Sequence, residues 1–415
     1  MNELIEKAIA SKEASRELAL YSSVQKNKAL KIMNQELLKN KDIIIQKNKI
    51  DIEKGIKKGL SKALLDRLSL NEKRIIEMAD GLKAIEKLKD PLGEVIEKFR
   101  RPNGLIISKI RVPIGVIGII YEARPNVTLD AAALCLKTSN AVILRGSSSA
   151  INSNKIIVKV LQNALKKAGI NKNAIHLIYS TDRKTAARFM KMNKYIDLLI
   201  PRGGAGLIKY VIKESTIPVL ETGVGNCHLY IDEYADIKKA LDITINAKTQ
   251  RPSVCNAIET LLIHKNVARK FIPMVFKELK NKGVEIRGCI KTKKIDKTIK
   301  ITKESDWHEE YLDLKLAVKI VDNIKEAVDH IYKYGTKHTE GIVTNNKNHA
   351  EYFINNIDAA AIMINASTRF TDGGQFGYGA EMGISTQKLH ARGPVGLKEL
   401  TSYKYIVLGN GQIRK

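Results

Sequence analysis

The sequence predicts an α/β protein with parallel sheets, because strand-length apolar runs alternate with helical segments from residue 113 onward. Residues 113–120 and 141–144 are such runs, and a helical pattern follows the second one from about residue 150 to 168. This order is typical of a doubly wound parallel sheet, in which ligands bind beyond the carboxyl ends of the strands. With 415 residues, the chain is long enough for two or three domains.

Before residue 113 the pattern is different. Residues 1–88 contain no proline, and apolar residues such as Leu30, Met33 and Leu37 recur at helical spacing, so we expect several helices there. Pro91 and Pro102 interrupt this pattern, and residues 104–112 predict an extended ribbon. Near the other end of the chain, residues 402–408 predict an exposed strand that could pair with a partner.

Two small-residue turns follow predicted strands and open helices. The first begins at Arg145, after the strand at 141–144, and the second spans residues 201–206, after a strand at 197–200. Free backbone N–H groups and the helix dipole favour anions at such turns, so both are candidate phosphate sites. Taken alone, such turns are more often ordinary strand-to-helix connections, and the chain contains no GxGxxG dinucleotide fingerprint.

Cys255 lies in a polar loop, Gln-Arg-Pro-Ser-Val-Cys-Asn, just before a strand predicted at 259–263. Arg251 and Lys248 are close in sequence, and nearby positive charge favours the nucleophilic thiolate form of a cysteine. The pattern therefore allows a partly exposed nucleophile; the alternative is a small buried side chain packed beside Val254 and Ile258. Further elements are predicted at 267–280, 314–321 and 324–334, and the glycine-rich loop 365–383 is long enough to be functional.

The composition is that of a globular protein, with 44% hydrophobic and 28% charged residues and a formal net charge of +27. The lysines are scattered over predicted helices, where solvated polar faces explain them, and aromatic residues are only 5%, so we expect no nucleic-acid partner. An electrostatic funnel for anionic small molecules is a milder use of the charge. No apolar run can span a membrane, and four widely spaced cysteines predict a reduced, cytoplasmic protein without a metal site.

Four motifs, taken together, point to a known family. They are Tyr-Glu-Ala-Arg-Pro-Asn-Val-Thr at 121–128, Leu-Arg-Gly-Ser-Ser at 144–148, Gln-Arg-Pro-Ser-Val-Cys-Asn at 250–256 and Phe-Thr-Asp-Gly-Gly-Gln-Phe-Gly-Tyr-Gly at 370–379. In this order they resemble the gamma-glutamyl phosphate reductase family of the aldehyde dehydrogenase superfamily, and the resemblance runs along the whole chain. It implies an aldehyde dehydrogenase-like fold, with a Rossmann-like cofactor domain, an α/β catalytic domain and a β oligomerisation flap.

The resemblance also implies domain boundaries. We expect an NADPH-binding domain over residues 1–224 with a return segment at about 360–385, and a catalytic domain carrying the nucleophile over residues 225–359. A C-terminal oligomerisation segment would occupy residues 386–415. Residues 104–112 and 402–408 would pair in the flap, which predicts a homodimer or a homotetramer.

The family reduces L-glutamyl 5-phosphate with NADPH to L-glutamate 5-semialdehyde and phosphate, the second step of proline biosynthesis from glutamate. By this resemblance, the thiolate of Cys255 attacks the acyl phosphate, expels phosphate and leaves a thioester that accepts hydride. A separate glutamate 5-kinase, which makes the substrate, is the expected partner. The rival functions are oxidation of a free aldehyde or reduction of another acyl donor by a superfamily relative and, from the charge alone, nucleic-acid binding.

The remaining site residues follow from the resemblance. Asn126 and the Cys255 backbone N–H would bind the oxyanion. Cofactor contacts would come from Arg145, Gly146, Ser147, Ser148, Gly203, Gly204, Gly206 and Glu310. The α-carboxylate of the substrate would be bound by Ser367, Thr368 and Arg369, or equally by Arg124. A guanidinium at position 145, where the superfamily usually has lysine, suits a 2′-phosphate and favours NADPH over NADH.

Two of these positions, and Glu221 besides them, have alternative roles. Asn126 departs from the usual Pro-Trp-Asn spacing of the superfamily and could instead belong to a structural turn after Pro125. Glu310 could be a solvated residue beside a helix. Glu221 matches the base that activates water in oxidative members, but a reductase that releases an aldehyde needs no such water, so Glu221 could equally position other groups.

Overall fold

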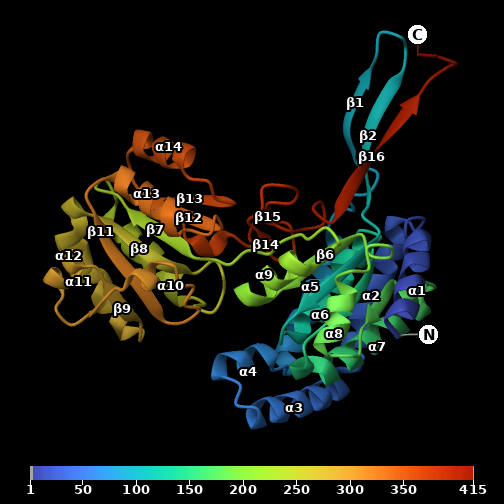
Figure 1. Cartoon of the computed structure of the whole chain (residues 1–415), viewed down its shortest axis with the longest axis horizontal. Coiled ribbons are helices and arrows are strands. Elements are labelled where there is room, and N and C mark those ends of the chain that lie inside the picture. Colours follow the sequence, from blue (N-terminus) through green and yellow to red (C-terminus); the bar gives the residue numbers. More distant parts are fainter. Residues whose placement is uncertain (1–2, 415) are drawn as a thin grey trace. The chain divides into compact units, whose positions relative to one another are not determined.

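The computed structural model describes residues 3–414, apart from the side chains of Lys62 and Ala63, and divides the chain into two compact units (Figure 1). The N-terminal unit runs to Thr222 and includes Gly377–Gly383 and the chain from Val395. The central unit comprises Gly223–Phe376 and Ile384–Pro394. Each unit is an α/β structure with parallel strands, as the alternating pattern predicts.

The boundaries differ from the predicted ones in the last third of the chain. Of the return segment predicted at about 360–385, only Gly377–Gly383 belongs to the N-terminal unit. The reason is backbone pairing, because Ala361–Ile364 forms strand β13 beside β12 (Thr339–Val343) in the sheet of the central unit. Likewise β14 (Ile384–Ser385) pairs with β15 (Gly393–Pro394), so the first part of the predicted oligomerisation segment lies in the central unit.

The N-terminal unit begins with the helices that the absence of proline predicts. They are α1 (Glu3–Leu18), α2 (Ser23–Lys39), α3 (Lys41–Lys57), α4 (Lys62–Leu68) and α5 (Glu72–Lys87). Ser22 starts α2 with a capping box that it forms with Gln25, which satisfies backbone N–H groups of the first turn. The periodic residues Leu30, Met33 and Leu37 of α2 are fully buried, so the apolar stripe faces the core.

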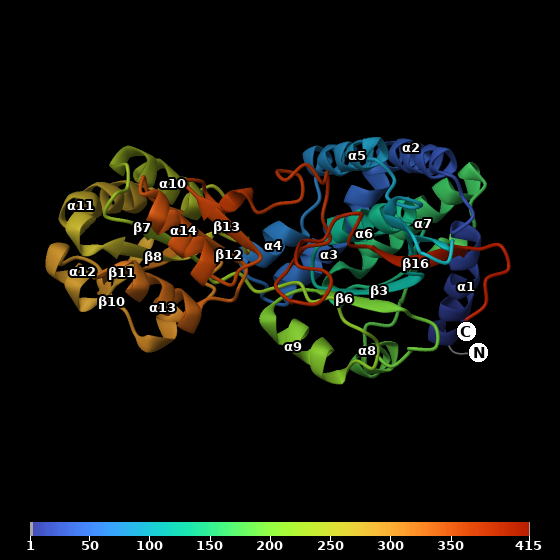
Figure 2. The same ribbon diagram turned by 90° about the horizontal axis from the view of Figure 1, so that it is seen from above.

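A four-stranded parallel sheet forms the core of this unit, in the order β5-β4-β3-β6. Its elements are β3 (Val116–Tyr121), α6 (Pro125–Lys137), β4 (Ala141–Arg145), the 3-10 turn Ser148–Ala150, α7 (Ile151–Ala168), the 3-10 turn Lys172–Ala174, β5 (Ile175–Leu177), α8 (Arg183–Phe189), β6 (Leu198–Arg202) and α9 (Ala205–Glu214). Every residue of β3 is buried, as expected for a central strand with helices on both faces (Figure 2). The carboxyl ends of β3, β4 and β6 therefore carry three loops to one edge of the sheet.

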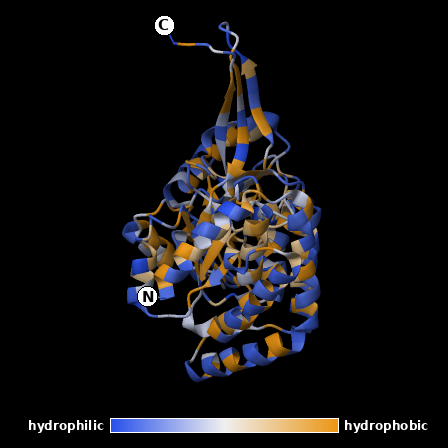
Figure 3. Cartoon of the chain, turned by 90° about the vertical axis from the view of Figure 1, so that its right-hand side faces the viewer, coloured by the Kyte–Doolittle hydropathy of each residue, from blue (hydrophilic) through white to orange (hydrophobic). Residues whose placement is uncertain are grey.

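The predicted ribbon forms a separate three-stranded sheet that extends from the rest of the unit (Figure 1). Strand β2 (Ile106–Pro113) pairs antiparallel with β16 (Thr401–Leu408), as expected, and on its other side with β1 (Val95–Arg100), which the sequence did not predict. Both outer strands carry exposed apolar side chains, among them Phe99, Tyr405 and Leu408. Figure 3 shows apolar and polar residues mixed along this ribbon.

A seven-stranded parallel sheet forms the core of the central unit, in the order β10-β9-β11-β8-β7-β12-β13. Besides β12 to β15, its elements are β7 (Cys227–Ile231), α10 (Ile237–Thr249), β8 (Ile258–His264), α11 (Lys265–Asn281), β9 (Glu285–Gly288), α12 (Ile290–Ile295), β10 (Lys300–Ile301), the 3-10 helix Glu304–Trp307, β11 (Lys315–Val321), α13 (Ile324–Tyr334), α14 (Lys347–Asn356) and the 3-10 turn Thr368–Phe370. Leu261 and Ile263 of β8 pack in one core with α11, whereas Leu262 packs in the other core with α13 and α14. Helices thus cover both faces of the sheet (Figure 2).

Within residues 3–414, we find no helix with the length and apolar content needed to cross a membrane.

Candidate active site

The loop that carries Cys255 connects α10 to β8 and lies at the amino edge of the central sheet, beside the start of β7. Cys255 is half-buried, so it is not the small, fully buried side chain that the alternative interpretation of the sequence describes. Its backbone carbonyl accepts a hydrogen bond from the Cys227 thiol at 3.1 Å. A Cβ on Gly225 would lie only 1.6 Å from the same carbonyl oxygen, so only glycine fits there. The backbone of the cysteine is therefore held in place by the start of β7.

Asn256 joins the Cys255 loop to the predicted substrate loop. Its side-chain Nδ2 donates to the carbonyl of Thr371 at 2.9 Å, and its own carbonyl accepts from the Thr368 hydroxyl at 2.7 Å. Arg369 adds a third link, because its Nε donates to Oε1 of Gln250 at 2.9 Å. Ser367 supports the same loop, since its hydroxyl accepts from the backbone N–H of Arg369. The structure thus brings Cys255 together with Ser367, Thr368 and Arg369.

The importance of Asn256 was not deduced from the sequence, although it directly follows the cysteine in the motif at 250–256. Its side chain is only 4% exposed, and its role depends on residues more than a hundred positions away. No local pattern reports such a contact. The one signal in the sequence is its position directly before the apolar run that starts at Ala257, where a buried amide needs hydrogen-bond partners.

Lys248 does not have the surroundings that its sequence position suggested. It is fully buried at the end of α10, and its ammonium group pairs with the Glu259 carboxylate at 2.5 Å and donates to the Ile258 carbonyl. Burial lowers the pKa of Lys248, and the charge of Glu259 opposes this change. The lysine therefore neutralises a buried carboxylate, and its charge is not held ready for the thiol.

Glu310 is half-buried and accepts a hydrogen bond from the backbone N–H of Gly225 at 2.7 Å. It is therefore not simply a solvated residue beside a helix. Its carboxylate holds Gly225, which packs on the Cys255 carbonyl. Glu310 therefore helps to fix the position of the Cys255 loop.

The other predicted residues lie in the N-terminal unit, at the carboxyl edge of its sheet. Asn126 is not in a simple turn: it lies in the first turn of α6, which begins with Pro125 and follows Arg124 as N-cap. The side-chain Nδ2 of Asn126 donates to Asp130 Oδ2 at 3.1 Å. Burial raises the pKa of Asp130 to about 6, while Asn126 and the charge of Arg202 oppose the shift.

The turn after β4 fits an anionic cofactor group. Nη2 of Arg145 donates to the carbonyls of Thr181 and Asp182, at 2.7 and 3.2 Å, and its Nε is buried without a hydrogen-bond partner within residues 3–414. Gly146 is tightly packed, since a Cβ there would lie 2.2 Å from Nδ2 of Asn154. Ser147 accepts from the N–H of Ser149, and Ser148 begins the turn that leads into α7. A buried donor without a partner is the feature expected where a ligand oxygen completes the bonding.

The turn after β6 is partly occupied by a side chain. The backbone N–H of Gly204, which caps α9, donates to the Glu122 carboxylate at 3.1 Å. A Cβ on Gly203 would also meet Glu122, whereas Cβ atoms on Gly204 and Gly206 would meet nothing within 4 Å. The N–H of Gly204 is thus already bound to a carboxylate, so an anionic group could use it only if Glu122 moved aside.

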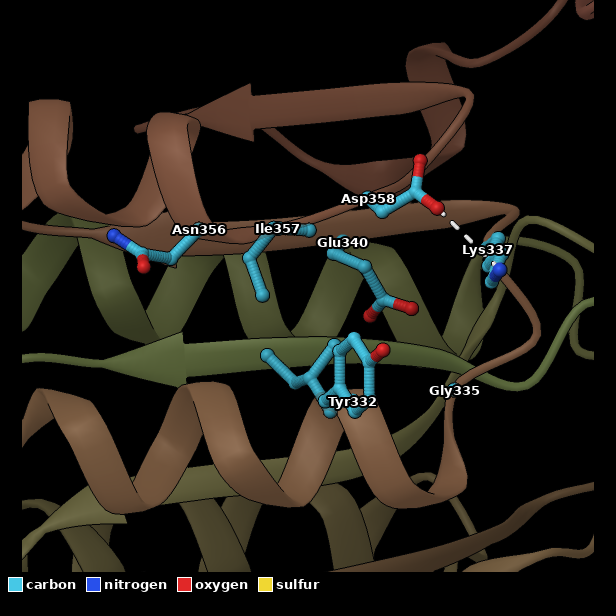
Figure 4. Close-up of a pocket in the computed structure, with 8 residues that line it drawn as sticks. Tyr332, Gly335, Lys337, Glu340, Asn356, Ile357 and Asp358 are labelled. Carbon is cyan, nitrogen blue, oxygen red and sulfur yellow. Dashed lines mark ion pairs between the residues drawn. The ribbon is translucent and has the colours of Figure 1, made fainter. Parts of the chain in front are cut away.

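A small pocket of the central unit contains none of the predicted site residues (Figure 4). One of its polar lining residues is Glu340, whose carboxylate is 1% exposed and accepts from the backbone N–H of His228 at 2.8 Å. Burial raises the pKa of Glu340, and the neighbouring His228 opposes this change. Lys337 and Asp358, which also line the pocket, form an ion pair at 3.4 Å. Within the described chain, no group of three His, Cys, Asp or Glu side chains could hold a metal ion.

The same region contains a buried histidine that should make the protein sensitive to acid. His330 is 4% exposed and packs edge-on against the ring of Trp307 and at a tilt against that of Tyr334. Burial, followed by the charge of His228, lowers the pKa of His330 from 6.5 to about 2. Below pH 6.5 the unfolded chain therefore binds a proton at this residue that the folded chain does not. The contribution of His330 to the free energy of unfolding is thus complete above pH 6.5 and is lost as the pH falls.

Between pH 7.5 and 5.5 this group alone should lower the free energy of unfolding by about 1.4 kcal/mol. Denaturant unfolding at the two pH values, on the wild type and on His330→Phe, measures the effect. The variant retains an aromatic ring but cannot bind a proton there. Its free energy of unfolding should therefore fall by about 1.4 kcal/mol less than that of the wild type between pH 7.5 and 5.5. An equal loss in both proteins would contradict the prediction.

Two α/β units, each built on a parallel sheet, and a half-buried cysteine in a loop that hydrogen bonds hold to residues 368–371 define a class of enzyme. This class is the oxidoreductases with the aldehyde dehydrogenase fold. A family model described as the aldehyde dehydrogenase family matches residues 2–286. The chain belongs to this family, and within it to the gamma-glutamyl phosphate reductases. It is thus an oxidoreductase of a family that uses a nicotinamide cofactor.

Three relatives carry this assignment. Gamma-glutamyl phosphate reductase of Clostridium perfringens strain SM101 is 59% identical over 413 residues, which cover 100% of both chains. The enzyme of that name from Caldicellulosiruptor bescii is 58% identical, again over 100% of both. The crystal structure of gamma-glutamyl phosphate reductase from Thermotoga maritima is 51% identical, covers 100% of both chains and superposes with a TM-score of 0.96.

Proposed function

We propose that this enzyme reduces L-glutamyl 5-phosphate with NADPH to L-glutamate 5-semialdehyde and phosphate, the second step of proline biosynthesis from glutamate. The observation that carries the proposal is the clamp between the Cys255 loop and residues 367–371, in a chain that is similar over its full length to enzymes named for this substrate. The clamp puts a nucleophile and an arginine in one rigid group, as an anionic acyl substrate requires.

In this mechanism the Cys255 thiolate forms a bond to the acyl carbon, and the bond from that carbon to the phosphate oxygen breaks. The Cys255 backbone N–H is one proposed donor to the oxyanion, and the Asn126 amide is the proposed second donor. Because Asp130 accepts one N–H of that amide, it orients the other. The nicotinamide, when bound, supplies the hydride that reduces the thioester, and the C–S bond then breaks to release the aldehyde.

Residues of the cofactor site have distinct proposed tasks. Arg145, Ser147 and Ser148 bind the 2′-phosphate at the end of β4, Gly146 allows the tight turn, and Gly203, Gly204 and Gly206 let the diphosphate approach α9. Glu310 would hold the nicotinamide ribose, and Arg124 is an alternative partner of the substrate carboxylate.

Assembly and location are also proposals. The exposed apolar side chains on β1 and β16 support a homodimer or a homotetramer formed through the flap. A cytoplasmic location and a contact with a separate glutamate 5-kinase fit the proposed pathway.

The reverse assay tests the proposed function. Purified protein should form NADPH from glutamate semialdehyde and NADP⁺ only when inorganic phosphate is present, because phosphate must displace the thiolate from the thioester. Oxidation to glutamate without phosphate would instead indicate an oxidative relative, with Glu221 as the base.

Replacing Arg145 by alanine should weaken NADPH binding far more than NADH binding. A bidentate contact to the 2′-phosphate is worth about 1.5–3 kcal/mol, so the KM for NADPH should rise roughly 10- to 100-fold while that for NADH changes little. Steady-state kinetics with both cofactors measures this, with Arg188→Ala, at an exposed arginine of α8, as control. If the KM rises equally for both cofactors, Arg145 does not contact the 2′-phosphate, and its role is limited to the hydrogen bonds with the Thr181 and Asp182 carbonyls.

A further inference from the structure

The proposed substrate carries two anionic groups at opposite ends, and only one of them has an assigned partner. The predicted residues were assigned to the α-carboxylate, which lies at the far end of the substrate from the reacting carbon. The phosphate is bonded through one oxygen to the carbon that Cys255 attacks. Cations that lie beside the cysteine itself are therefore better placed for the phosphate than for the carboxylate.

Arg369 lies across the Cys255 loop. Its carbonyl accepts from Asn256 Nδ2 at 3.4 Å, and its Nε donates to Gln250 Oε1 at 2.9 Å. The two partners precede and follow Cys255 in the loop. The hydrogen bond from Nε fixes the plane of the guanidinium. The two Nη groups are not used in this bond and can bind two oxygens of one anion.

Arg251 supplies a second guanidinium from the same loop. It directly follows Gln250, the partner of Arg369, and is exposed, and no hydrogen bond or ion pair to another part of residues 3–414 holds its side chain. Burial lowers the pKa of Arg369, and the charge of Arg251 lowers it further, while Asp372 and the Cys255 sulfur act in the opposite direction. Two positive charges on one loop disfavour each other, so an anion with two charges would stabilise both.

We propose that Arg251 and Arg369 form a phosphate subsite beside Cys255, which binds the phosphoryl group of the acyl phosphate and then inorganic phosphate. The inference rests on the proposed function, adds Arg251 to it, and assigns Arg369 to the phosphate instead of the α-carboxylate, for which Arg124 is the remaining arginine. As the C–S bond forms and the C–O bond breaks, the electron pair of the broken bond stays on the phosphate oxygen. Two guanidinium groups stabilise this growing charge. In reverse, a phosphate oxygen attacks the thioester carbon, and the thiolate leaves.

The reverse assay measures the subsite directly, because phosphate and semialdehyde can be varied independently. In Arg251→Ala the KM for inorganic phosphate should rise about tenfold or more, whereas the KM for the semialdehyde should stay within about twofold. Arg251→Lys should recover part of the loss, since it restores the charge but not the fork of donors. Arg269→Ala, which removes an exposed arginine from α11 of the same unit, should change neither constant.

A second measurement does not need turnover. Inorganic phosphate should slow the alkylation of Cys255 by iodoacetamide in the wild type, and about tenfold more phosphate should be needed in Arg251→Ala. If the wild type lacks the phosphate-dependent reaction but this protection remains, the proposed function fails and the subsite stands. The subsite is overturned if the KM for phosphate and the protection are unchanged in Arg251→Ala, or if both KM values rise equally.

Discussion

Replacing Cys255 by alanine is expected to abolish the phosphate-dependent formation of NADPH, with a loss of about 10⁴-fold or more in kcat. Loss of a nucleophile has this order of effect because no other group can take over the covalent step. The structure supports the choice of residue: Cys255 is half-buried in a fixed loop, whereas Cys135 and Cys227 are buried. Steady-state rates at saturating phosphate and semialdehyde measure the loss.

Cys289→Ala is the matched control for this variant. Cys289 is also half-buried and lies in the same unit, where it caps α12 and contacts the Thr292 hydroxyl. It takes no part in the proposed reaction, so its removal should leave kcat nearly unchanged. If activity survives in Cys255→Ala and disappears in Cys289→Ala, the nucleophile has been assigned to the wrong cysteine.

Gly225→Ala is expected to have the next largest effect, although Gly225 takes no part in the chemistry. An added Cβ would lie 1.6 Å from the Cys255 carbonyl oxygen and 2.7 Å from its Cα, and both neighbours are backbone that cannot rotate away. The Cys255 loop must therefore shift by more than about 1 Å, and a displacement of that size costs roughly 100-fold in rate. Strain should also lower the free energy of unfolding by about 1–3 kcal/mol.

Kinetics and denaturant unfolding of the same preparation separate the two effects. The control is Gly81→Ala in α5, where an added Cβ meets nothing within 4 Å. That change should leave the rate unaffected and raise stability by about 0.5–1 kcal/mol, because alanine favours the helix. A Gly225→Ala enzyme with normal kcat would show that the position of the Cys255 carbonyl does not matter for catalysis.

The sequence by itself determined the features that depend on local pattern. The spacing of apolar residues predicted a helix at 324–334, which has the same bounds as α13. The apolar runs at 141–144 and 314–321 lie within about one residue of the bounds of β4 and β11. Four motifs in order identified the family, because their spacing and chemistry are visible along the chain. The cysteine at 255 was found in the same way.

The tertiary structure decided what depends on residues that are distant in sequence. Gly225 and Cys227 fix the carbonyl of a cysteine about 30 residues away, and Asn256 clamps a loop more than 110 residues away. Lys248, which the sequence placed near the thiol, is instead buried against Glu259. Such contacts leave no local period, because side-chain partners are chosen by the packing of whole elements and by the need to pair every buried polar group.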